Sequence, residues 1–228
     1  MLFVIVFALY SCKKTETTVA DTPTADSTTI GQSDTVQVAE WTSKNQEFLD
    51  KFRTIELDSS RFVAPRYDEP KIGPSISKTE LELFPKSLNV DSFVGEPEMF
   101  QAFLKFEIDE NHYGLVARMP GEYSFTSMKL FFYDKKQDAI IPQVFELADA
   151  TGDAGYSEEI KSWLWKDKNE LKSFTYHWTK VEKIEPDDPT RESRTDDYYI
   201  IKLSPEKIDA VRVSKTDLPK YQKFLNQK

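Results

Sequence analysis

The sequence predicts an α+β domain, predominantly an antiparallel β meander (a sandwich or an open barrel), with two short N-terminal helices. Three observations predict this fold class. Apolar side chains alternate with period two over most of the chain after Glu98. Turn-forming residues interrupt the alternation roughly every 10 to 15 residues. Two helix-capping patterns come before the alternating segments, so we expect the helices to precede the sheet.

The first expected helix begins near Ser43, because Ser43 and Gln46 form the capping-box pattern S-x-x-Q. We expect this helix to end near Arg53. A second capping box, S-x-x-E, begins at Ser77 and predicts a short helix that Pro85 stops. Between the two helices, residues 58–74 hold several prolines and read as irregular or edge structure. The apolar residues that share one face of the first helix are Phe48, Leu49 and Phe52.

The alternating segments predict strands, and a third helix is expected at residues 221–225. Pro142 makes an uninterrupted central strand unfavourable where it stands. The charged run from Glu182 to Asp197 predicts a loop between strands, either a long hairpin tip or a partner contact. The expected strands lie at residues 99–108, 111–119, 124–134, 139–147, 161–167, 170–182, 197–204 and 209–214.

The N-terminus has the pattern of an export signal. Residues 2–9 are all apolar, and as a helix they would span only about 12 Å, too short for a bilayer core of about 30 Å. Such a run fits the apolar core of a signal peptide. The segment Leu9-Tyr10-Ser11-Cys12 resembles a bacterial lipobox. The resemblance implies that Cys12 is lipidated and becomes the mature N-terminus; an ordinary cleaved signal with a free thiol is the alternative.

Residues 13–40 are rich in Thr and lack aromatic side chains, so they cannot bury enough surface to offset the entropy of ordering. We therefore expect a signal peptide at residues 1–11, the lipidated Cys12 with a disordered tether at residues 12–40, and one β-rich domain at residues 41–228. The residue after Cys12 is Lys13. In the lipoproteins that the signal resembles, an Asp there retains the protein at the inner membrane, so the outer membrane is expected.

The composition excludes some functions. The formal net charge is -9, which argues against a nucleic-acid partner, because neutralising phosphates requires a basic surface. A single Cys cannot form a disulfide within the chain. The sequence has no Walker A, Rossmann or G-x-S-x-G pattern and implies no cofactor. We therefore expect no catalytic residue, and we expect His112 and His177 to be strand-surface or structural residues.

The segment from Leu147 to Tyr156 allows a metal-binding hypothesis. Asp149, Thr151 and Asp153 have the i, i+2, i+4 spacing of the front of a calcium loop. The remainder of the loop pattern is missing. The alternative is a Gly/Asp turn after a strand.

Four aromatic residues suggest a second binding hypothesis. Trp163 and Trp165 are two apart, as are Tyr176 and Trp178, so each pair shares one face of a strand. If the two strands pair, the four rings form one aromatic strip. The strip serves either as core packing or as an exposed platform for a sugar or a peptide.

The layout resembles small lipoproteins of unknown function from Bacteroidota. The resemblance lies in the lipobox with Lys13, the polar tether, Phe48-Leu49, and the segments from Leu147 to Tyr156 and from Ser162 to Leu164. It implies no catalytic residue. We therefore expect a membrane-anchored envelope lipoprotein whose domain is a non-catalytic binding or structural module, with a protein or glycan partner. The alternatives are a hydrolase of envelope glycans or peptides and a calcium-binding module.

Overall fold

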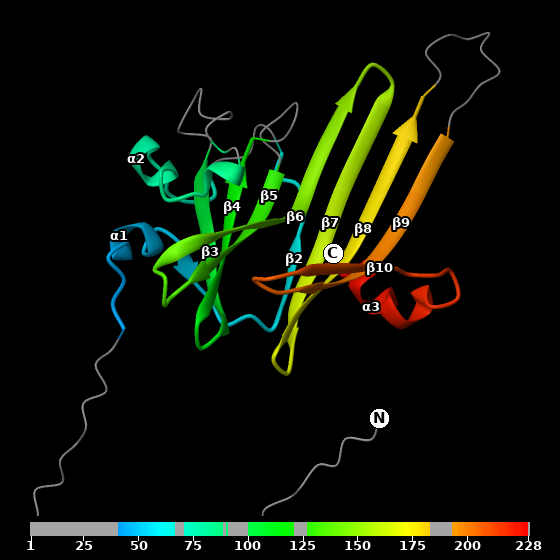
Figure 1. Ribbon diagram of the computed structural model, residues 1–228. Coiled ribbons are helices and arrows are strands. Elements are labelled where there is room, and N and C mark those ends of the chain that lie inside the picture. Colours follow the sequence, from blue (N-terminus) through cyan, green and yellow to red (C-terminus); the bar gives the residue numbers. More distant parts are fainter. Residues whose placement is uncertain are drawn as a thin grey trace, which may run out of the picture. The chain divides into compact units, whose positions relative to one another are not determined.

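The alternating segments form one open sheet in the computed structural model, which describes residues 41–66, 71–88, 90, 100–120, 127–182 and 193–227. Ten strands of the described part run in the order β1-β3-β4-β5-β6-β7-β8-β9-β10, with β2 beside β7 (Figure 1). The strands are β1 (Arg53–Thr54), β2 (Ser59–Phe62), β3 (Gln101–Asp109), β4 (His112–Met119), β5 (Ser127–Asp134), β6 (Ala139–Asp153), β7 (Tyr156–Asp167), β8 (Glu170–Val181), β9 (Ser193–Leu203) and β10 (Ile208–Arg212).

The expected meander is confirmed from β3 to β10, where each strand pairs antiparallel with the next along the chain. The sheet is mixed, because β1 runs parallel to β3. It is also open, since β1 and β10 stand at opposite ends of the strand order. The choice between a sandwich and an open barrel stays a prediction.

The two short N-terminal helices are not borne out. In their place are single turns, α1 (Gln46–Leu49) and α2 (Lys78–Leu81), of four residues each. The first expected capping box is absent, because Asn45 is the N-cap and its side chain makes no capping bond. The second is present: the Ser77 side chain accepts from the Glu80 amide. Among the described residues, the other helical elements are η1 (Lys86–Leu88), η4 (Leu218–Tyr221) and α3 (Gln222–Leu225).

Strand β6 joins the two halves of the sheet. Its first part pairs with β5 as far as Ala148, and its last part, from Asp149, pairs with β7. Pro142 falls in the first part, near a register irregularity, at a position where β7 is not the neighbour. This placement satisfies the constraint noted for Pro142, because a proline ring is tolerated where one side of the strand has no ladder bond to lose.

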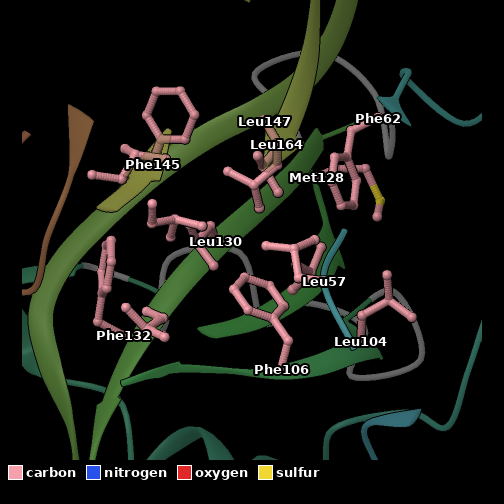
Figure 2. Close-up of a cluster of buried hydrophobic side chains, with 14 of the residues drawn as sticks. Leu57, Phe62, Leu104, Phe106, Met128, Leu130, Phe132, Phe145, Leu147 and Leu164 are labelled. Atoms are coloured by element: carbon pink, nitrogen blue, oxygen red, sulfur yellow. The ribbon is translucent and has the colours of Figure 1, made fainter. Parts of the chain in front are cut away.

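A hydrophobic cluster connects the two halves. Phe106, Leu130 and Phe132 come from the β3–β5 half, and Leu164 and Leu203 come from the β7–β9 half. Figure 2 shows Phe106, Leu130 and Leu164 within this cluster, together with Leu57 and Phe62 from the segment before the meander. The burial of such side chains is the main favourable contribution to folding.

The other face of the β3–β6 half packs against the N-terminal helical turns. Phe48 and Leu49 of α1 and Leu81 of α2 belong to one buried cluster with Leu115 of β4 and Phe131 of β5. The apolar residues expected to share a helix face therefore do reach the core, although the helices themselves are single turns.

A polar cluster attaches the first described residues to the turn between β5 and β6. The hydroxyls of Ser43 and Tyr133 each donate to Oδ1 of Asp138 over 2.5 Å. The Lys44 amide donates to Oδ2 over 2.9 Å, and the Asn45 side chain donates to the Asp138 carbonyl over 3.0 Å. Burial and the hydrogen bond to Asp138 raise the pKa of Tyr133 to about 12. This cluster, called the Asp138 cluster below, fixes the start of the domain.

The chain divides at Glu40, and Trp41–Lys228 forms one compact unit. The predicted signal peptide (residues 1–11), Cys12 and the predicted tether (residues 12–40) lie outside the described residues. No described helix has the length and apolar character needed to cross a membrane.

Candidate functional site

The four aromatic residues singled out in the sequence lie on one face of the paired strands β7 and β8. The register sets Trp163 opposite Phe174, Lys161 opposite Tyr176, and Glu159 opposite Trp178. The predicted strip is thus confirmed as a shared face, which we call the outer face. Strand β9 extends it, because Tyr198 stands opposite Tyr176 and Asp196 opposite Trp178.

One part of the outer face is covered by the C-terminal helical segment, η4 and α3 (Figure 1). Trp163, Trp165 and Phe174 form what we call the aromatic row. Phe224 of α3 packs against all three rings and stacks on Trp165 with ring centroids 4.9 Å apart. Tyr221 stacks on Phe174 with centroids 5.3 Å apart. The core-packing interpretation therefore holds for Trp163 and, in part, for Trp165.

Trp163 carries an unmet hydrogen-bond donor. The side chain is 2% exposed, and its Nε1 has no hydrogen-bond partner in the described part of the chain. Buried donors in native proteins normally find a partner, and one left without carries a desolvation cost. The sequence offers no signal for this, because it depends on which atoms the fold places around the indole.

The rest of the outer face is partly exposed and forms a hydrogen-bonded network, called the polar-aromatic strip below. Its members are Glu159, Tyr176, Trp178, Arg194 and Asp196. The Tyr176 hydroxyl donates to Asp196 over 2.5 Å and accepts from Arg194 over 2.9 Å. The Trp178 indole donates to Glu159 over 2.7 Å. The Arg194 guanidinium lies 4.9 Å from the centre of the Trp178 ring, in cation–π geometry.

The titration of the strip follows from these bonds. Burial raises the pKa of Tyr176 to about 12, and the hydrogen bond to Asp196 acts in the same direction. The bond from Tyr176 lowers the pKa of Asp196, and Arg194 lowers it further. Both shifts keep the proton on the phenol of Tyr176 and the charge on the carboxylate of Asp196.

A groove of about 920 Å³ borders the strip along β9. One wall is residues 194–198 of β9, and the other is residues 212–215 with Leu218. It exists because β9 extends beyond β10: the register with β10 covers Tyr199–Leu203, whereas residues 193–197 pair with β8. The expected loop from Glu182 to Asp197 is thus corrected in its last part, since residues 193–197 are strand and residues 183–192 lie outside the described part.

The segment proposed as a calcium loop does not form a loop. Asp149, Thr151 and Asp153 lie in the extended strand β6, and each pairs with a residue of β7. Alternate residues of a strand are about 6.6 Å apart along its axis, so their oxygens do not converge as they do in a calcium loop. The turn that follows β6 consists of Ala154 and Gly155. The described residues contain no group of three or more His, Cys, Asp or Glu side chains that could hold a metal ion.

Both histidines lie on strands and contact a carboxylate. Nδ1 of His112 lies 2.9 Å from Oδ1 of Asp109, and Nε2 of His177 lies 2.9 Å from Oε1 of Glu158. These contacts agree with the expected strand-surface placement.

A carboxyl group with a raised pKa lies outside the strip. Burial raises the pKa of Glu146 on β6, although its pairing with Lys129 acts in the opposite direction. Ser127 also donates to Glu146, over 2.6 Å. The Ser127 hydroxyl thus donates to a carboxylate that is already paired with Lys129.

No protein-family model, no curated protein and no solved structure matches this chain.

Proposed function

We propose that the chain is an envelope lipoprotein, anchored in the outer membrane through an acylated Cys12, whose β-rich domain is a non-catalytic binding module. The N-terminal sequence carries the anchor part of this proposal. An uncharged apolar run, a small residue and the lone cysteine of the chain follow one another in the order of a lipobox. Several acyl chains would hold the protein on a membrane far more firmly than one chain alone.

The polar-aromatic strip supports the binding part. Its hydrogen bonds hold Tyr176, Trp178 and Arg194 in place before any ligand arrives, and preorganised side chains reduce the entropy lost on binding. Tyr, Trp and Arg are also the residues most enriched at the energetic centres of interfaces.

The arrangement of the rings favours a protein partner over a glycan. A sugar stacks on the open face of an aromatic ring. Here Tyr176 and Tyr198 stack on each other with centroids 4.9 Å apart, and Arg194 covers Trp178. The groove beside β9 is lined by charged and polar side chains with backbone at its edge, which suits an extended or helical segment of a protein.

Two experiments test the proposal. Mass spectrometry of membrane-extracted protein should show acylation at Cys12, and Cys12→Ala should move the protein into the soluble fraction. A wild type that is soluble and unacylated would refute the anchor. For the binding part, Trp178→Ala and Tyr176→Phe should lower the yield of a partner that cross-links to the wild type in intact cells. Val181→Ala, which alters an exposed side chain on the other face of β8, should leave that yield unchanged.

The two alternatives from the sequence stay predictions. A hydrolase would need a carboxyl group held protonated near the strip, whereas the pKa of Asp196 is lowered there. Calcium binding would raise the melting temperature on addition of calcium.

A further inference from the structure

We propose that the C-terminal helical segment, residues 218–225, is a displaceable internal occupant of a peptide-binding site formed by the aromatic row, and that this site takes an amphipathic helical segment of a partner protein with aromatic side chains three residues apart. The inference rests on the proposed non-catalytic binding function and gives it a ligand class. It is carried by how the segment is seated, by the unmet donor beneath it and by the shortness of its two uncapped helical turns.

The segment is seated as a bound helix would be. Leu218, Tyr221 and Phe224 are spaced three apart, so they lie on one side of the helical segment and contact the sheet. Phe224 is 4% exposed and lies 5.5 Å from Phe174, centroid to centroid. Helices that dock in grooves use this spacing of anchor residues, and the segment therefore displays the chemistry that the aromatic row accepts.

The site retains an unused polar group beneath its occupant. Nε1 of Trp163 is buried and has no acceptor within the described residues. Trp163 itself contacts Phe224, with centroids 6.3 Å apart, and Phe224 offers no acceptor to it. A segment with a hydroxyl, carbonyl or carboxylate near that indole would satisfy the donor, and would therefore have an advantage over the internal occupant.

The internal occupant has little helical stability of its own. Its helical part is two consecutive four-residue turns, η4 and α3, and isolated helices of that length are unstable in water. Neither turn has a side-chain cap. Within residues 218–225 only Phe224 is buried, and the ion pair that Lys220 forms with Asp217 is local. Such a segment can open without unfolding the sheet.

The site continues into the groove beside β9. Leu218 belongs both to the segment and to the wall of that groove, and Tyr198 connects the groove to Phe174 by a ring contact. A partner helix seated on the aromatic row would therefore reach Arg194 and Asp196 at its end. The aromatic row would bind the apolar side chains of the partner helix, and the charged side chains of the groove would determine in which direction that helix runs.

The experiment uses the full chain and a synthetic peptide with the sequence of residues 214–228, labelled for fluorescence anisotropy. Phe224→Ala in the protein should vacate the site, and the peptide should then bind at least about 10-fold more tightly than to the wild type, in which the tethered copy competes at high effective concentration. The same peptide with Ala in place of its Phe should not bind. Val181→Ala, which alters an exposed side chain on the other face of β8, is the control and should behave as wild type.

Two results would overturn the inference: no binding of the peptide to a folded Phe224→Ala protein, or equal binding to wild type and variant. If an N-acetylglucosamine hexasaccharide binds the variant where the peptide fails, the site takes a glycan instead. If Phe224→Ala does not fold, Tyr221→Ala, which removes a half-buried ring, replaces it. If the peptide binds but Cys12 of the protein is not acylated, only the proposed membrane anchor is refuted. If Cys12 is acylated but the peptide does not bind, only the present inference is refuted.

Discussion

Gly114 of β4 lies directly opposite Phe106 of β3, and the Phe106 ring covers the position that a Cβ at residue 114 would occupy. Such a Cβ would stand 2.6 Å from Cε2 of the ring. The glycine is therefore required by a close approach between a core ring and the neighbouring strand.

Gly114→Ala should lower the free energy of unfolding by about 1–3 kcal/mol, because the buried ring must leave its preferred position. Urea denaturation measures the change. Phe106→Leu in the same chain should recover part of the loss, so the two substitutions should be non-additive in a double-mutant cycle. Gly152→Ala is the matched control, since its Cβ would meet nothing closer than 3.3 Å. Additive effects of the Gly114 and Phe106 substitutions would contradict the explanation.

The β6–β7 hairpin turns on Ala154 and Gly155, both with positive φ, of 47° and 84°. Two positive φ values define a type I′ turn, for which Asn-Gly is the favoured pair. Ala154→Asn should therefore raise the free energy of unfolding by about 1 kcal/mol, since an alanine in the left-handed region is strained. Gly155→Ala should lower it. Thermal and urea unfolding of both variants check the prediction, and a destabilised Ala154→Asn protein would be the adverse result.

Asp138 should make the domain sensitive to acid. Burial opposes its ionisation, but bonds from Ser43 and Tyr133 and the Lys44 amide outweigh burial, so its pKa in the folded state is below 3.8. A carboxyl group with a lowered folded pKa stabilises the fold above its unfolded pKa, and this stability is lost as the pH falls through the folded pKa. Asp138→Asn should therefore show a smaller loss of stability below about pH 4 than the wild type. Urea midpoints measured across that range decide the matter.

Two tyrosines should limit stability in alkali. The pKa values of Tyr133 and Tyr176 are both raised from 10.0 to about 12, first by burial and then by a carboxylate partner. A group whose folded pKa is raised contributes stability that is fully present below its unfolded pKa. This stability is lost as the pH rises through the folded pKa. Between pH 10 and 12 the wild type should lose stability faster than Tyr133→Phe or Tyr176→Phe. Tyr199→Phe, which alters a hydroxyl without a hydrogen-bond partner in the described segments, should follow the wild type.

Period-two alternation was enough to predict the β3–β10 meander, because each of these strands pairs with its neighbour in sequence. It failed where partners are distant. The segment Ser59–Phe62 is short and mostly polar, and period two gives no indication that it pairs with β7. Gly152 and Asp153 favour turns, yet pairing with β7 keeps them extended, since ladder hydrogen bonds outweigh local propensity.

The candidate site divides in the same way. The shared face of Trp163 and Trp165 with Tyr176 and Trp178 follows from strand geometry and could be predicted. The contribution of Arg194 could not, because its charged neighbourhood reads as a loop. Nor could the cover over the aromatic row be predicted. The sequence predicts a helix at residues 221–225, where the structure has the single turn α3, but nothing local indicates which face it packs against.

The Asp138 cluster has a mechanical consequence. A pull along residues 1–40 would reach the folded chain at Ser43, and the bonds to Asp138 and Tyr133 would pass it to β5. That strand is hydrogen-bonded to β4 on one side and to β6 on the other. The load would thus be shared among interior strands, and the two-residue edge strand β1 would not peel away first.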